Sequence, residues 1–347
     1  MNKTNKKIKW LCSVLLPVFL AAVTGCGKAE ETAVSFHTEL QENYLNDTYD
    51  NYKVYANGTE ELSKPLPVTV SADSSDTKLY ISEYEDFSAG TDYMVKDGKT
   101  EIYNLKIHTK YYIKHSGKEE ASVSYLVTDS LAPRNLFVEG VTNIRDVGGW
   151  TREEGGYVKQ GLLYRSSKFN KDESTELLVT EEGIKTLTED LLIKTEIDLR
   201  TVDDNENGGI TKSPLGDGVT YYSVPLKSGG NIILLNKDKL PELFEILGNE
   251  DNYPVVFHCS IGTDRTGMLA FLVNALMGVS EEDLYRDFLF SNFGNIGKLR
   301  TPSIIETYMD TVDMASGENL SEKVYNYLVG AGVKAEDIDS LKKILSE

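Results

Sequence analysis

The segment Val255 to Leu269 constrains the fold of this chain more than any other stretch. It begins with an apolar run that ends at His258 and Cys259, passes through five residues to Arg265, and continues as an apolar helical pattern. A strand that leads through a short loop into a helix is typical of α/β folds, and open α/β sheets bind their ligands at the carboxyl edge. We therefore expect Cys259 at the ligand-binding edge of a sheet.

The five residues between Cys259 and Arg265 are suited to form a cradle for an anion. They allow the backbone to curl so that its N–H groups point inward, and Gly262 can adopt a conformation that a residue with a Cβ resists. Such a loop at a helix N-terminus binds a dianion and favours the thiolate of Cys259, which is the form that attacks. The planar guanidinium of Arg265 matches two phosphate oxygens, a geometry that lysine cannot supply.

Further residues of this segment complete the expected site. We expect Thr266 to donate a hydrogen bond to the sulfur when it leaves as a thiolate, and His258 to orient the loop from behind. The expected phosphate-binding residues are Ser260, Ile261, Gly262, Thr263 and Gly267. The alternative interpretation is a buried, inert cysteine at the end of a strand.

Strands and helices alternate from about residue 133 onward, so we expect an α/β domain over residues 133–347. Apolar runs predict strands at 194–200, 220–225 and 253–259, and helical patterns lie at about 180–190, 239–248 and 265–277. The C-terminal part, 281–345, is helical in pattern. Short apolar strands interleaved with helices imply a parallel-rich central sheet that helices cover on both faces.

Residues 65–132 predict a small all-β sandwich, because six short alternating runs are separated by turn-forming clusters. The stretch Leu105 to Tyr111 resembles a motif of fibronectin type III domains in which a tyrosine hydroxyl pins a corner between strands, with Ile107 in place of the usual proline. Residues 26–64 are polar and predict a flexible tether followed by the start of this domain. The expected role is a spacer, with glycan or protein binding left open.

Residues 1–25 are typical of an export signal, with four lysines before an apolar run of about 14 residues, too short to span a bilayer as a helix. The sequence Val23 to Cys26 resembles the lipobox of bacterial lipoproteins, which implies a diacylglyceryl anchor on Cys26 and an extracytoplasmic protein. A transmembrane anchor or an ordinary secretory signal is the alternative. Removal of the leader would leave Cys259 as the only thiol of the folded part.

The acidic charge of the chain excludes some classes of partner. The formal net charge is −19, and loss of the four leader lysines makes it −23. Nucleic acid and anionic membrane surfaces would repel such a protein, so we expect neither a nucleic-acid partner nor charge-driven membrane binding. We expect attachment to a membrane through the lipid alone.

The loop that follows Val255 to Phe257 resembles the active-site loop of protein tyrosine phosphatases. Further motifs are similar, in the same order, to a bacterial family that includes secreted tyrosine phosphatases: Asn143–Gly149, Leu163–Ser167, Ile197–Arg200, Asp287–Asn292 and Ala331–Val333. The resemblance covers roughly residues 135–347. It implies that Cys259 is the nucleophile, that Arg265 clamps phosphate and that a phosphocysteine intermediate is hydrolysed by water, with no metal or other cofactor.

Two departures from this family pattern affect specificity and mechanism. Thr263 stands where members often carry a lysine that is associated with phosphoinositide binding. Residues 224–230, a region where better-known eukaryotic phosphatases carry an acidic residue, contain no carboxylate. Asp264 is therefore the first candidate for protonating the leaving group. Its alternative role is to fix the loop by bonding to the backbone or to a neighbouring basic group.

Four cations outside the loop could place positive charge near the mouth of the site: Arg145, Arg165, Arg200 and Lys227. We count Arg145 among the substrate-binding candidates. For each of the four, a structural salt bridge is the alternative, and Arg200 with Asp198 is an example.

The expected activity is hydrolysis of phosphomonoesters, above all phosphotyrosine in proteins, with phosphoserine and phosphothreonine also open. Hydrolysis of inositol phosphates or phosphoinositides is the nearest alternative, and a deep, basic pocket would favour it. A sulfurtransferase also uses a loop cysteine but would not need Arg265 to Gly267 in this arrangement. An inactive surface module for phospho-ligand binding or adhesion is the alternative from another class.

Overall fold

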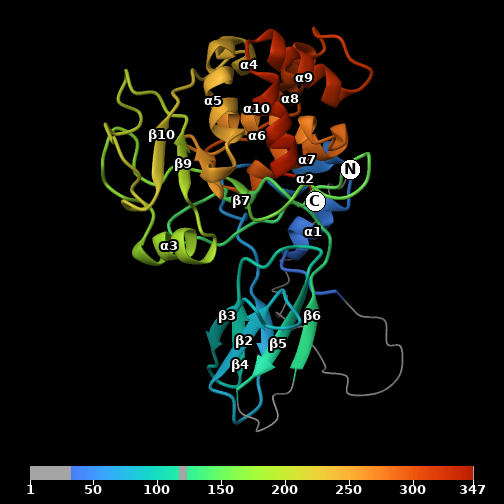
Figure 1. Cartoon of the computed structure of the whole chain (residues 1–347), viewed down its shortest axis with the longest axis vertical. Coiled ribbons are helices and arrows are strands. Elements are labelled where there is room, and N and C mark those ends of the chain that lie inside the picture. The colour runs from blue at the N-terminus through green and yellow to red at the C-terminus, as the bar shows by residue number, and fades with distance from the viewer. Residues whose placement is uncertain (1–32, 117–122, 347) are drawn as a thin grey trace, which may run out of the picture.

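The computed structural model of the chain describes residues 33–116 and 123–346 (Figure 1). An α/β lobe contains most of the chain, and a smaller all-β lobe extends from it. The predicted leader and Cys26 lie outside the described residues. None of the helices in the described ranges combines the length and the hydropathy needed to cross a membrane.

The central sheet of the α/β lobe is mixed but mainly parallel, as the alternating pattern predicts. Its strand order is β10-β9-β11-β8-β7, in which only β7 runs antiparallel to its neighbour. The strands are β7 (Arg145–Asp146), β8 (Leu163–Ser166), β9 (Thr195–Asp198), β10 (Thr220–Ser223) and β11 (Val255–His258). All residues of β8, β9 and β11 are buried, including polar and charged side chains such as Arg165 and Glu196.

The helices of this lobe cover the sheet and confirm the predicted helical segments. They are α3 (Glu181–Lys185, extended by a π-helical turn Thr186–Asp190), α4 (Ile232–Leu235), α5 (Leu240–Leu247), α6 (Asp264–Leu276), α7 (Glu281–Phe290), α8 (Ser303–Val312), α9 (Leu320–Gly330) and α10 (Ala335–Ile344). Short 3-10 turns lie at Lys237–Lys239, Glu250–Asn252 and Ser291–Phe293.

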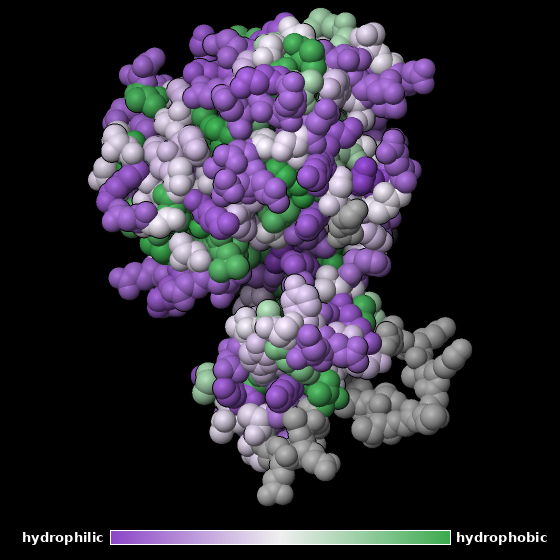
Figure 2. All heavy atoms as spheres, viewed as in Figure 1, coloured by the Kyte–Doolittle hydropathy of each residue, from purple (hydrophilic) through white to green (hydrophobic). Residues whose placement is uncertain are grey.

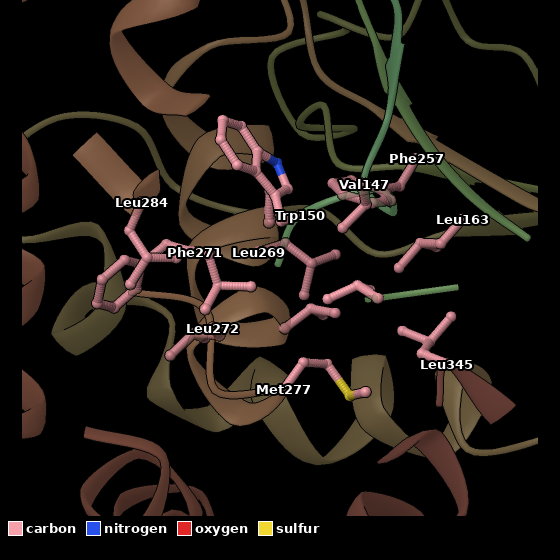
Figure 3. Packing of buried hydrophobic residues seen from close by; sticks show 14 of the residues in the cluster. Val147, Trp150, Leu163, Phe257, Leu269, Phe271, Leu272, Met277, Leu284 and Leu345 are labelled. Atoms are coloured by element: carbon pink, nitrogen blue, oxygen red, sulfur yellow. The ribbon is translucent and has the colours of Figure 1, made fainter. Parts of the chain in front are cut away.

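Helix α6, which follows the cysteine loop, lies at the centre of the core. All of its residues after Asp264 are buried, and it contacts α7, α9, β8 and β11. Leu269 and Leu272 of this helix belong to the same buried cluster as Leu163 and Phe257 from the sheet (Figure 3). A helix that is apolar on all sides must be enclosed in this way, so the start of α6 has a rigid position.

The smaller lobe contains six strands: β1 (Val68–Ser71), β2 (Lys78–Ser82), β3 (Thr91–Met94), β4 (Lys99–Ile102), β5 (Lys110–His115) and β6 (Val123–Val127). They form an antiparallel four-stranded sheet, β3-β2-β5-β6, and a β1-β4 pair. Apolar residues from both sheets, among them Val68, Leu79 and Ile113, belong to one buried cluster.

In the segment that resembles the fibronectin motif, the tyrosine hydroxyl bonds to the backbone. The hydroxyl of Tyr111 accepts a hydrogen bond from the backbone N–H of Lys106 at 2.7 Å. Ile107, which replaces the usual proline, is fully buried, and its N–H and C=O both bond to the side chain of Gln160 in the α/β lobe. A proline could not donate the first of these bonds, so this position serves the contact between the lobes.

The described part of residues 26–64 differs from the expected tether. It contains α1 (Glu39–Leu45), a 3-10 turn (Tyr49–Asn51) and α2 (Tyr52–Tyr55). The ring of Tyr44 is buried 5.3 Å from that of Phe293, and its hydroxyl donates to the backbone carbonyl of Arg286. This segment is therefore part of the α/β lobe, anchored by a few apolar side chains within a polar sequence.

The visible face of the molecule is mostly hydrophilic, with apolar side chains in small separate groups over both lobes (Figure 2). This agrees with the high content of acidic and basic residues.

Candidate active site

The cysteine loop connects β11 to α6 at the carboxyl edge of the sheet, as the sequence predicts. Cys259, only 2% exposed, directly follows β11. Gly262 has φ of +70°, and a Cβ on it would lie 2.4 Å from the carbonyl oxygen of Ser166 at the end of β8. Only glycine combines this conformation with so close an approach, so Gly262 is required for the path of the loop.

The backbone of the loop presents its N–H groups as an anion cradle. Within the described residues, the N–H groups from Ser260 to Arg265 have no hydrogen-bond acceptor. The carbonyls are held on the opposite side, because Asn143 Nδ2 donates to the oxygens of Ile261 and Gly262 at 3.0 and 3.1 Å. N–H groups without an acceptor at the N-terminus of a helix are suited to bind phosphate.

Arg265, the predicted clamp, is held by an acidic residue that the sequence analysis missed. Its Nη1 donates to Glu206 Oε2 at 2.7 Å and its Nη2 to Oε1 at 2.5 Å, and Ser260 Oγ also donates to Oε1 at 2.6 Å. Burial disfavours the carboxylate, but the hydrogen bonds from Arg265 and Ser260 outweigh it and lower the pKa of Glu206. The guanidinium is thus fixed in orientation beside the cradle.

Glu206 lies in the acidic loop 201–206 after β9. Loops that follow neighbouring parallel strands meet at the same edge of a sheet, so an acid here could have been proposed as a partner of Arg265. The sequence contains several acidic residues in this loop, and spacing alone does not select Glu206.

Asp264 is bound by a second residue that the sequence analysis missed, Arg300. The Nε and Nη2 atoms of Arg300 donate to the two carboxylate oxygens of Asp264, both at 2.8 Å. Asn292 holds the backbone of Arg300 through two hydrogen bonds. This geometry corresponds to the alternative role of Asp264, a bond to a basic neighbour, because both oxygens are engaged away from a leaving group.

The other two predicted catalytic side chains are buried on either side of the cysteine. His258 lies behind the loop, where its Nε2 is 2.9 Å from Glu196 Oε1 and its ring packs on Phe169. The hydroxyl of Thr266 is buried and has no hydrogen-bond partner in the part of the chain that the structure describes. The expected bond from Thr266 to the sulfur of Cys259 is therefore absent from these contacts.

Arg145 was predicted to bind substrate, and the structure contradicts this. It is 1% exposed and bonds to Asp287 Oδ1 at 2.8 Å and to Asn143 Oδ1 at 2.6 Å. Its role is the structural salt bridge that the sequence analysis left as the alternative. A guanidinium that is buried and saturated in this way cannot reach a ligand at the mouth.

Two further predicted binding residues support the loop from inside. Thr263 is fully buried, and its Oγ1 accepts a hydrogen bond from Asn143. A Cβ on Gly267 would lie 2.8 Å from the ring of Phe288, so this glycine lets α6 approach α7 closely. Both residues shape the loop, because the Thr263 hydroxyl is engaged by Asn143 and Gly267 has no side chain.

Two groups of side chains offer three possible metal-ligand atoms each: Glu196, Asp198 and His258 behind the loop, and Asp73, Asp76 and His115 in the all-β lobe. In the first group, Asp198 binds the guanidinium of Arg200 at 2.7 Å, and Glu196 also accepts a hydrogen bond from Ser213. These partners make the first group a buried polar network that supports the ends of β9 and β11.

The family and the curated relative to which this chain is similar are described as phosphatases. Residues 136–347 match the profile described as the tyrosine phosphatase family. A protein of Cupriavidus necator, provisionally named a tyrosine-protein phosphatase, is 24% identical to this chain over 186 residues. The match covers 46% of this chain and 64% of that protein, so the chain spans less than two thirds of its relative. Among solved structures, the core catalytic domain of the PP-IP phosphatase Siw14 from S. cerevisiae with citrate shows 23% identity and a TM-score of 0.31, covering 46% of this chain and 86% of its own. P. aeruginosa TpbA shows 19% sequence identity and a TM-score of 0.32. This match covers 49% of this chain and 90% of the TpbA chain.

Proposed function

The chain belongs to the tyrosine phosphatase family, and we propose that it hydrolyses phosphotyrosine in proteins through a phosphocysteine intermediate on Cys259. The observation that carries this proposal is the set of N–H groups from Ser260 to Arg265 that have no acceptor within the described residues, in the loop between Cys259 and α6. A dianionic phosphate is the ligand that such a cradle stabilises most strongly.

The reaction has two steps. The thiolate of Cys259 attacks phosphorus, so that a P–S bond forms while the P–O bond to tyrosine breaks and the phenolate takes a proton from water. Water then attacks the phosphocysteine, the P–S bond breaks, and inorganic phosphate leaves as the thiolate returns. The loop N–H groups and Arg265 stabilise the charge on the equatorial oxygens in both steps.

The engaged position of Asp264 favours phenolic over alkyl leaving groups. Arg300 binds both carboxylate oxygens, so Asp264 does not offer a proton to the leaving oxygen in this arrangement. A phenolate, with a pKa of about 10 in tyrosine, leaves with less protonation than an alkoxide does. Phosphotyrosine is therefore a better substrate for this geometry than phosphoserine or an inositol phosphate.

The charge balance at the mouth also favours a phosphomonoester over a polyphosphate. Three cations near the loop each have a carboxylate partner: Arg265 with Glu206, Arg300 with Asp264, and Lys168 with Asp172. A polyphosphorylated inositol would need cations that are free to bind its further phosphates. These three cations are not free to do so, and Lys227, next to the Leu226 carbonyl that bonds to Arg265, is an exposed cation with no ion pair within the described residues.

We also propose where in the cell the protein is located. The lipobox-like sequence ending at Cys26 supports an extracytoplasmic protein that is anchored by lipid, with the all-β lobe, whose corner resembles fibronectin type III domains, as a spacer. Replacement of Cys26 by Ser should release the protein from the membrane fraction of its host. Retention of Cys26→Ser in that fraction would contradict lipid anchoring.

The activity is tested with the purified protein in the presence of EDTA on a phosphotyrosine peptide, a phosphoserine peptide and inositol hexakisphosphate. We expect turnover of the phosphotyrosine peptide, and loss of all turnover in Cys259→Ser. Met314→Ser, at an exposed position between α8 and α9, is the matched control and should keep the activity. Hydrolysis by Cys259→Ser at the rate of the unmodified protein, or failure of the unmodified protein on all three substrates, would contradict the proposal.

A further inference from the structure

A buried ionic network beneath the cysteine loop contains more positive than negative charge. Asp287 of α7 accepts from Arg145 Nε at 2.8 Å through one oxygen and from Arg165 Nη1 at 2.5 Å through the other. Both arginines are at most 1% exposed, and Asp287 is 5% exposed. Two guanidinium groups share one carboxylate, so the cluster carries one excess positive charge in a region shielded from water.

Arg165 brings this excess charge to the loop. Its Nη2 donates to the carbonyl oxygen of Gly262 at 2.9 Å, and its Nε has no hydrogen-bond partner within the described residues. Arg165 pairs with Phe257 in the parallel register of β8 and β11, two residues before Cys259. Burial and the neighbouring Arg145 lower the pKa of Arg165 to about 10, while Asp287 and Cys259 oppose this shift.

Other groups surround the cysteine. Arg165, Arg265, Arg300 and Tyr308 interact with it electrostatically. Arg265 and Arg300 each face a carboxylate of their own, whereas Arg165 shares Asp287 with Arg145. The network behind β11 consists of Glu196, Asp198, Arg200 and His258. Among the three arginines that interact with the cysteine, Arg165 thus has the smallest share of a counter-charge.

We propose that Arg165 is a positioning residue for the phosphatase reaction, which holds the Gly262 carbonyl outward and supplies buried positive charge beneath Cys259. The inference rests on the proposed function. The cradle and Arg265 contact the substrate in the proposed reaction. Arg165 is a further cation that acts without contacting the substrate. Its effect is to stabilise the thiolate before the substrate arrives and the phosphate dianion afterwards.

The test compares Arg165→Gln with Arg165→Lys in the full chain, with two measurements that need no turnover. The first is the rate of alkylation of Cys259 by iodoacetamide as a function of pH, and the second is the affinity for orthovanadate. In Arg165→Gln, we expect the midpoint of alkylation to move upward by about one pH unit and vanadate to bind about tenfold more weakly. Arg165→Lys keeps the charge, so its midpoint should stay close to that of the unmodified protein.

A merely structural role of Arg165 predicts a different result, because both variants lose the fork that binds Gly262 and Asp287. Equal shifts in the two variants, or no shift in Arg165→Gln, would overturn the inference. Asp287→Asn supplies a further comparison if Arg165→Gln does not fold, because loss of the carboxylate raises the net positive charge and should move the midpoint downward. An upward shift in Asp287→Asn would count against the inference. If vanadate does not bind the unmodified protein, the proposed function fails instead.

Discussion

The guanidinium of Arg265 donates to both carboxylate oxygens of Glu206, at 2.7 and 2.5 Å, across 59 positions of the chain. Ser260 of the same loop donates to this carboxylate as well. The carboxylate of Glu206 therefore bonds to side chains at both ends of the loop, Ser260 and Arg265. The orientation of the clamp is established before any phosphate binds.

Glu206→Gln should lower kcat while leaving KM within a small factor. The amide accepts through a single oxygen and carries no charge, so Arg265 loses one of two charge-assisted hydrogen bonds, each worth about 1.5–3 kcal/mol. If this loss acts on the transition state, kcat falls by about 10- to 100-fold. Steady-state kinetics on a phosphotyrosine peptide measure it. Asp203→Asn, exposed in the same loop, is the control and should be nearly unchanged.

The Glu206 ion pair also predicts how stability depends on pH. The pKa of Glu206 is lowered in the folded protein, so its stabilising contribution is complete above its ordinary pKa of 4.5 and is lost as the pH falls toward the folded-state value. The difference in Tm between the unmodified protein and Glu206→Gln should therefore shrink as the pH decreases from 6 to about 3. Thermal unfolding at a series of pH values measures this. A difference that grows in acid would show that the pair does not favour the ionised carboxylate.

Part of this site could be predicted because its information is local. Cys259, Gly262 and Arg265 lie within one strand–loop–helix unit, and the backbone conformation of that unit places them. Glu206, the partner of Arg265, lies 59 positions away from it, and Arg300, the partner of Asp264, lies 36 positions away. Each lies in an irregular loop, where no periodic pattern indicates which way a side chain points.

The expectations for Arg145 and for the N-terminal segment differ from the structure because local sequence does not contain the deciding contacts. Positive charge in a motif indicates a phosphate site or a buried ion pair equally well, and the acid that decides between them, Asp287, lies 142 positions beyond Arg145. The segment around Tyr44 is polar because α1 buries only Gln41, Tyr44 and Leu45. So short an apolar pattern does not distinguish a packed helix from a tether.

Gly262→Ala should nearly abolish activity. A Cβ at φ of +70° is strained, and it would lie 2.4 Å from the Ser166 carbonyl oxygen, so the loop must leave its place against β8. We expect kcat/KM to fall by at least about 100-fold, since a displacement of about 1 Å already costs this much. Gly218→Ala, whose Cβ would meet no atom within 4 Å, is the matched control. Near-normal kinetics in Gly262→Ala would show that the loop tolerates another path.

Asp264→Asn should slow phenyl phosphates and alkyl phosphates by similar factors. Both oxygens of Asp264 bind Arg300, so the substitution loosens the start of α6 without removing an acid. Arg300→Gln should have a comparable effect, and the double variant should be no worse than either single variant, because the two residues act as one unit. Rates on a series of esters with different leaving groups measure this. If Asp264→Asn slows alkyl esters far more than phenyl esters, Asp264 protonates the leaving group.

Tyr44→Ala should destabilise the α/β lobe, because the N-terminal segment packs into its core. The ring of Tyr44 lies 5.3 and 6.4 Å from those of Phe293 and Phe290, and its loss leaves a cavity beside the segment that carries Asp287. We expect a loss of about 3–5 kcal/mol in the free energy of unfolding, measured with urea. Leu40→Ala, at a more exposed position of the same helix, should cost far less. Equal and small effects of both substitutions would indicate that residues 33–64 are a tether after all, and that the catalytic lobe is stable without them.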